Sequence, residues 1–102
     1  MNIIEHFVNG KKFPGNSKRT SKVFNPATGE QTAEVKLAST KDTDAAVEAA
    51  KTAFISWSKK TPLQRARVMF KFKELIEKNF DELTKIIVLE HGKVFDDAKG
   101  EV

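Results

Sequence analysis

Apolar and polar residues alternate in the first third of the chain. Ala33, Val35 and Leu37 point one way along residues 30–37 while charged and polar residues point the other, which predicts a strand with one buried face. Residues 22–24 predict a partner strand, joined to it through the turn Asn25-Pro26-Ala27-Thr28-Gly29. These strands should form one short ribbon.

A second ribbon is predicted before it. Residues 3–8 and 11–13 are predicted strands, and Asn9-Gly10 between them is a turn pair that tolerates positive backbone angles. Residues 14–21 are polar, contain a proline and a glycine and lack an apolar anchor, so we expect a mobile loop there. Two short ribbons bury too little surface to be stable alone, and we expect them to pack on helices or on another body.

Helical periodicity begins at residue 39. Ser39 or Thr40 can cap a helix that reaches Trp57, and Asp42 and Asp44 in its first turn suit the helix dipole. Alanines share one face of this helix with Trp57, which predicts close packing against a neighbouring element; these are Ala46, Ala50 and Ala53. We interpret Trp57 as a core residue that closes this helix against the next.

Two more helices follow with clear start and stop signals. Thr61 caps a helix over residues 62–78, with Pro62 at its first position and Gln64 closing a capping box. Its apolar arc is wide and predicts neighbours on more than one side. Asn79 and Glu82 suggest another capping box, which starts a helix that should stop at Gly92.

A last helical pattern runs to the final residue. Val94, Phe95, Ala98 and Val102 share one face, without a polar last turn or a glycine or asparagine stop. We therefore expect the sequence to be the front part of a longer protein. Strands followed by three to four helices predict the α+β class.

Composition sets limits on function. The 102 residues are 39% hydrophobic and 31% charged, as in a soluble globular protein, and no apolar run reaches the roughly 20 residues that span a bilayer. The start resembles neither a secretion signal nor a transit peptide, so a cytoplasmic location is expected. Without cysteine, these residues offer no disulfide, thiolate metal site or thiol nucleophile.

Most of the net charge of +4 lies on the second predicted helix. Residues 59–79 carry seven basic and two acidic residues. These basic residues could contact phosphates of a nucleic acid, or they could form a solvated helix surface, which is the usual role of such charge runs and our interpretation. The seven are Lys59, Lys60, Arg65, Arg67, Lys71, Lys73 and Lys78.

Four places resemble sites, and each has a structural interpretation that we prefer. Glu90, His91 and Lys93 combine a carboxylate, an imidazole and an ammonium, yet a lone histidine at a helix end usually acts as a cap or dipole partner. His6 is expected on a strand surface. Arg65 and Arg67 point different ways on a helix and suit surface ion pairs, and Trp57 suits the core better than an interface.

Four stretches, in their order and spacing, resemble the beginning of an aldehyde dehydrogenase. In chain order they are Phe7-Val8-Asn9-Gly10-Lys11, Asn25-Pro26-Ala27-Thr28-Gly29-Glu30, residues 42–58, and Leu89-Glu90-His91-Gly92-Lys93. Within that superfamily, four further motifs resemble the CoA-acylating methylmalonate-semialdehyde dehydrogenase branch: Ser39-Thr40-Lys41, Trp57-Ser58-Lys59, Arg65-Ala66-Arg67-Val68-Met69-Phe70-Lys71-Phe72 and Asp97-Ala98-Lys99-Gly100-Glu101-Val102. The superfamily commonly has Asn where this chain has His91.

The resemblance implies NAD-dependent oxidation of an aldehyde on a cysteine, followed by acyl transfer to coenzyme A. In the methylmalonate-semialdehyde branch the acyl group also loses carbon dioxide and becomes propionyl-CoA. The family's catalytic and cofactor-binding residues lie beyond residue 102, so catalytic, cofactor and metal residues are all predicted as none here, and the segment alone should be inactive. Some members of the superfamily bind a monovalent cation through backbone carbonyls, which here would be those of Val23 or Phe24. Backbone ligands leave no signal in the sequence.

Alternation gives way to helical periodicity near Ala38-Ser39, which predicts an N-terminal hairpin arm over residues 1–38 and a helical part over residues 39–102. By the resemblance, the helical part is expected to belong to an incomplete, α/β cofactor-binding domain. The expected partner is the remainder of its own chain, in a homo-oligomer when complete and with self-association when isolated; no nucleic acid or membrane is expected. Two alternatives stay open: a small helical protein-interaction module, and a basic nucleic-acid-binding domain.

Overall fold

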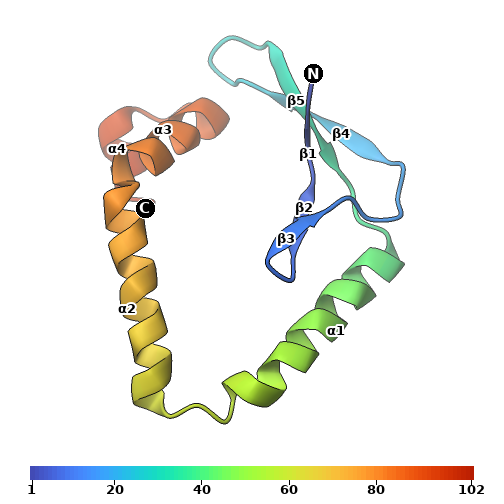
Figure 1. Ribbon diagram of the computed structural model, residues 1–102. Helices are drawn as coiled ribbons and strands as arrows, with labels where there is room; N and C mark the ends of the chain where they lie inside the picture. Colours follow the sequence, from blue (N-terminus) through green and yellow to red (C-terminus); the bar gives the residue numbers. More distant parts are fainter. The chain divides into compact units, whose positions relative to one another are not determined.

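Five strands precede four helices in the computed structural model, which describes all residues, 1–102 (Figure 1). This order confirms the predicted α+β class. The chain divides into two compact units, the first made of Met1–Val23 and Gln31–Lys59 and the second of Phe24–Glu30 and Lys60–Val102. The predicted domain boundary between residues 38 and 39 stays a prediction.

A three-stranded sheet forms the centre of the first unit. Strand β5 (Gln31–Lys36) lies between β1 (Asn2–Ile4) and β4 (Thr20–Phe24). β1 runs parallel to β5, with Asn2 opposite Ala33. Ala33 is buried, as its place in the alternating pattern predicted.

A separate hairpin, β2 (His6–Val8) and β3 (Lys11–Phe13), pairs antiparallel. Its turn has positive φ at Asn9 (55°) and Gly10 (76°), as the Asn-Gly pair predicted. The single strand predicted over residues 3–8 is wrong, because the chain breaks at Glu5 and its two halves join different sheets. Both halves are extended and rich in β-branched or aromatic residues, so the local pattern could not show the change of partner.

Helix α1 (Thr40–Trp57) begins after Ser39. The Ser39 side chain accepts a hydrogen bond from the Asp42 amide, which satisfies one of the free N–H groups of the first turn. The predicted alanine contact holds only in part: Ala46 and Ala49 are half-buried, whereas Ala50 and Ala53 are exposed. Trp57 is half-buried at the end of the helix.

The second unit contains α2 (Pro62–Lys78), α3 (Phe80–His91) and α4 (Phe95–Lys99) (Figure 1). The capping box predicted at Thr61 is present: the Gln64 amide donates to Thr61 Oγ1 at 3.2 Å, and the Thr61 amide donates to Gln64 Oε1 at 3.0 Å. α3 ends at Gly92, whose φ of 83° is left-handed, as predicted for a glycine stop.

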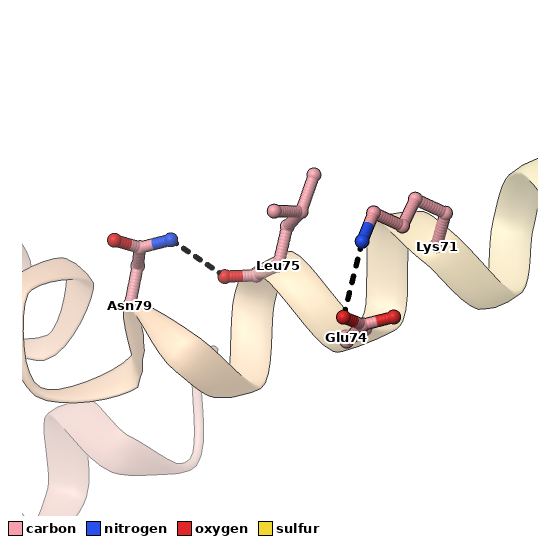
Figure 2. Close-up of polar contacts among 4 residues, drawn as sticks. All are labelled: Lys71, Glu74, Leu75 and Asn79. Atoms are coloured by element: carbon pink, nitrogen blue, oxygen red, sulfur yellow. Dashed lines mark hydrogen bonds and ion pairs between the residues drawn. The ribbon is translucent and has the colours of Figure 1, made fainter.

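The capping box predicted at Asn79 and Glu82 is absent. Asn79 precedes α3 without a side-chain bond to that helix, and its Nδ2 instead donates to the Leu75 carbonyl of α2 at 2.8 Å (Figure 2). Its φ of −106° and ψ of 18° differ from the extended conformation of an N-cap. Asn79 therefore ends α2 and does not cap α3.

The last helix is shorter than its apolar pattern predicted. α4 spans five residues and ends at Lys99, followed by Gly100. Ala98 has no exposed surface, and neither does Thr84 of α3, whose hydroxyl donates to the Phe80 carbonyl at 2.8 Å. The buried part of the second unit therefore lies around α3 and α4.

Much apolar surface of α2 stays exposed in the second unit. This surface carries the wide apolar arc predicted from the sequence; its residues are Leu63, Val68, Met69, Phe70, Phe72 and Leu75. An exposed apolar surface of this extent is typical of a contact surface. None of the helices is both long and apolar enough to cross a membrane.

Candidate functional site

The most completely bonded side chain of the first unit is the carboxylate of Asp42, which is 2% exposed. Its Oδ2 accepts from the Ser39 amide at 2.8 Å, and its Oδ1 accepts from the Asn16 amide at 2.7 Å. The amides of Ser39 and then Asn16 lower the pKa of Asp42 from 3.8 to about 2, against the opposing effect of burial. Asp42 is therefore held as a carboxylate.

These bonds correct the expectation of a mobile, unanchored loop over residues 14–21. Asn16 is held by Asp42, and the Arg19 guanidinium donates to the Ala38 carbonyl at 2.8 Å. Thr20 and Ser21 already belong to β4. The loop is anchored by polar contacts, and its sequence lacks the apolar residue that would have indicated an anchor.

A hollow of about 340 Å³ lies where the hairpin meets the first half of α1. His6 lines it and is half-buried, so the strand-surface position predicted for this residue is wrong. Its Nε2 is buried without a hydrogen-bond partner, and its ring centroid lies 6.3 Å from that of Phe13. The other residues that line this hollow are Phe7, Val8, Phe13, Ala38, Asp42, Thr43 and Ala46.

The cluster suggested by Glu90, His91 and Lys93 does not assemble into a site. Glu90 and His91 are exposed, and Lys93 forms an ion pair with Glu101. The hydrogen bond and charge of Lys93 lower the pKa of the Glu101 carboxyl, with a smaller contribution from His91. Lys93 thus ties the segment after α4 to the segment after α3.

The basic helix α2 is partly neutralised along its own surface. Lys71 contacts Glu74 at 3.1 Å, as Figure 2 shows, and Lys73 contacts Glu77 one turn further along. Arg65 is half-buried and donates through Nη1 to the Lys60 carbonyl at 3.0 Å, while Arg67 is exposed. These contacts favour the interpretation of a solvated helix surface.

Neither a metal-binding cluster nor a thiol is present among these residues. No group of three or more His, Cys, Asp or Glu residues could hold a metal ion, and the sequence contains no cysteine. The Val23 carbonyl, considered for a cation, accepts a hydrogen bond from the Thr32 hydroxyl at 3.3 Å. The polar contacts described above join loops to the ends of helices and strands.

The sequence predicted Asp42 in the first helical turn, but not its hydrogen bonds to the Ser39 and Asn16 amides. The pattern Ser39-Thr40-Lys41-Asp42 has capping-box spacing and could have indicated the bond back to Ser39. The bond to Asn16 has no such signal, because it joins residues 26 positions apart.

The chain belongs to the aldehyde dehydrogenase family. The family's sequence profile matches residues 13–102, nearly the whole chain. This confirms the resemblance drawn from the ordered motifs.

Among its relatives are malonate- and methylmalonate-semialdehyde dehydrogenases. The chain is 48% identical to a structure from Sinorhizobium meliloti 1021 assigned to methylmalonate-semialdehyde dehydrogenase and complexed with NAD, with a TM-score of 0.96 over 100% of this chain and 21% of that one. It is also 48% identical to methylmalonate-semialdehyde dehydrogenase from Oceanimonas doudoroffii, with a TM-score of 0.94 over 99% of this chain and 20% of that one.

A curated relative is the malonate-semialdehyde dehydrogenase of Bacillus pumilus (strain SAFR-032). It is 40% identical over 98% of this chain and 21% of its own length. The chain thus spans about a fifth of the length of the relatives that it matches, and its fold corresponds to the N-terminal part of theirs.

Proposed function

We propose that these 102 residues are the N-terminal scaffold segment of an NAD-dependent, CoA-acylating semialdehyde dehydrogenase. The observation that carries the proposal is the match of the whole chain, at 48% identity and a TM-score of 0.96, to the Sinorhizobium meliloti 1021 structure that is assigned to methylmalonate-semialdehyde dehydrogenase and complexed with NAD. The segment itself contributes strands and helices, and it is inactive alone because it lacks a cysteine nucleophile.

The proposed reaction converts methylmalonate semialdehyde to propionyl-CoA. A thiolate elsewhere in the enzyme adds to the aldehyde carbon, and hydride leaves for NAD, which gives an acyl-enzyme thioester and NADH. Loss of carbon dioxide and transfer of the acyl group to the thiol of coenzyme A release propionyl-CoA. Coenzyme A is supported by the likeness to the methylmalonate-semialdehyde branch, and malonate semialdehyde is the competing substrate that the curated relatives suggest.

The exposed apolar surface of α2 supports the scaffold role. Phe70, Met69 and Val68 would be covered by the remainder of the enzyme, because burial of such side chains contributes about 1.5–3 kcal/mol each. Assembly into a homo-oligomer and a cytoplasmic location belong to the same proposal, as does self-association of the segment when it is isolated.

The test starts from the native polypeptide. An antibody raised against residues 61–93 should capture a protein several times heavier than 11.4 kDa from the source cells. That protein should form NADH and propionyl-CoA from methylmalonate semialdehyde and NAD when coenzyme A is present. A captured protein near 11.4 kDa with no activity would overturn the proposal.

Two further assays test the CoA-acylating reaction and the substrate separately. Production of free acid and NADH without coenzyme A would leave an aldehyde dehydrogenase but reject the CoA-acylating reaction. A much higher kcat/KM for malonate semialdehyde than for methylmalonate semialdehyde would change the substrate and keep the reaction class.

A further inference from the structure

We infer that Asp42 is a clamp that fastens the loop of residues 14–19 across the junction of β5 and α1, and thereby positions the hairpin β2–β3 against the first half of α1. One carboxylate bonds two segments: Oδ2 accepts from Ser39 at the start of α1, and Oδ1 accepts from Asn16 in the loop. Carboxylates that accept backbone N–H bonds form strong, charge-assisted contacts.

The loop backbone lies directly against this carboxylate. A Cβ atom on Gly15 would be 2.8 Å from Oδ2 and 3.0 Å from Cγ of Asp42. The φ of Gly15 is also positive, at 72°. Only glycine therefore allows the loop to approach Asp42 this closely without strain.

Arg19 fastens the other end of the loop to the same junction. Its guanidinium donates to the Ala38 carbonyl at 2.8 Å, and its own carbonyl accepts from the Leu37 amide at 3.0 Å. The loop is thus attached on both sides of the segment that joins β5 to α1.

The clamp also limits where the hairpin can lie. β3 ends at Phe13, only three residues before Asn16, so a fixed Asn16 keeps Phe13 close to α1. Phe13, His6 and Asp42 line the same hollow. Release of Asn16 should therefore change the surroundings of the His6 ring as well as the loop.

The test uses amide hydrogen exchange of the native polypeptide, with Asp42→Asn as the variant and Asp44→Asn, in the same helical turn but exposed, as the matched control. In Asp42→Asn, exchange at Asn16 and Ser39 should accelerate about tenfold or more, while the amides of α2 keep their wild-type rates. Trypsin should also cut faster after Lys18, and the His6 ring resonances should shift. Wild-type exchange at Asn16 in this variant would overturn the inference.

If Asp42→Asn accelerates exchange everywhere, Gly15→Ala decides. This change keeps the carboxylate and Ser39 but crowds the loop. Faster exchange at Asn16, with a shifted His6 resonance, supports the clamp, whereas unchanged exchange at Asn16 and unchanged His6 resonances overturn it.

Discussion

The ring of Pro26 closes the space beside Gly92: a Cβ atom on Gly92 would lie 3.1 Å from Cγ of Pro26 and 3.6 Å from its Cβ. The turn after β4 thus contacts the C-terminal end of α3 within the second unit. Both residues belong to motifs that carried the family resemblance, and their contact gives these motifs a shared structural role.

Replacing Gly92 by alanine should destabilise the fold by about 2 kcal/mol. About half of this cost comes from the left-handed φ of 83°, and the rest from the contact with Pro26. Gly29→Ala is the matched control, since Gly29 has a φ of 74° but nothing within 4 Å of its Cβ position. Urea unfolding should show a loss of about 1 kcal/mol for that control.

The double variant Gly92→Ala with Pro26→Ala isolates the contact. Pro26→Ala should lower the free energy of unfolding less in the Gly92→Ala protein than in the wild type, because it removes the proline ring atom that crowds the new Cβ atom. Strictly additive losses would contradict a contact between these two residues.

Asn79→Asp should lower stability by about 0.5–1.5 kcal/mol, because a carboxylate cannot donate to the Leu75 carbonyl as the Asn79 amide does. At a true N-cap the two residues are nearly equivalent. Thr61→Asp is the comparison at a site where the side chain accepts a bond, and its loss should be small. An unchanged or raised unfolding midpoint for Asn79→Asp would instead indicate that Asn79 caps α3.

The stabilising contribution of Asp42 should disappear at acid pH. Its pKa is lowered to about 2 in the folded chain from an ordinary value of 3.8, so the folded state favours the charged form. The contribution is present above about pH 4 and is lost as the pH falls towards 2. The difference in urea midpoint between wild type and Asp42→Asn should therefore shrink over this range; a constant difference would contradict the assignment.

The ion pairs on α2 should contribute little to stability. Glu77→Gln and Glu74→Gln should each change the free energy of unfolding by less than about 0.5 kcal/mol, because all four side chains are more than 60% exposed. Added salt should reduce even this effect. A loss above about 1 kcal/mol in either variant would show that these pairs are buried in the assembled protein.

A nucleic-acid interface on α2 should be absent. We expect no salt-dependent binding to DNA or RNA at low ionic strength, since Lys71 and Lys73 are paired and Arg65 contacts a carbonyl. Tight binding that is lost on charge reversal of Arg65, Arg67 and Lys71 would revive the basic-domain alternative.

The sequence predicted the helices well because their signals are local. Thr61 and Gln64 lie three residues apart, and their capping box depends only on the backbone that they flank. Gly92 ends α3 through its own backbone freedom. The Asn9-Gly10 turn was predicted for the same reason.

What the sequence could not show depends on contacts between distant segments. Asp42 accepts a hydrogen bond from Asn16, and β1 pairs with β5. Neither interaction leaves a periodic pattern in the sequence. The spacing of Asn79 and Glu82 did predict a capping box. The Asn79 side chain instead donates to the Leu75 carbonyl in the last turn of α2. The sequence contains no cysteine, so it could not indicate a thiol nucleophile.

The three residues of β1 protect the central strand of the sheet. β5 is paired on one side by β4 and on the other only by Asn2–Ile4. Trimming these residues, or pulling them away with a bulky N-terminal tag, would turn β5 into an edge with a free row of N–H and C=O groups. Such an edge can pair with strands of other molecules, so loss of the first four residues should increase aggregation.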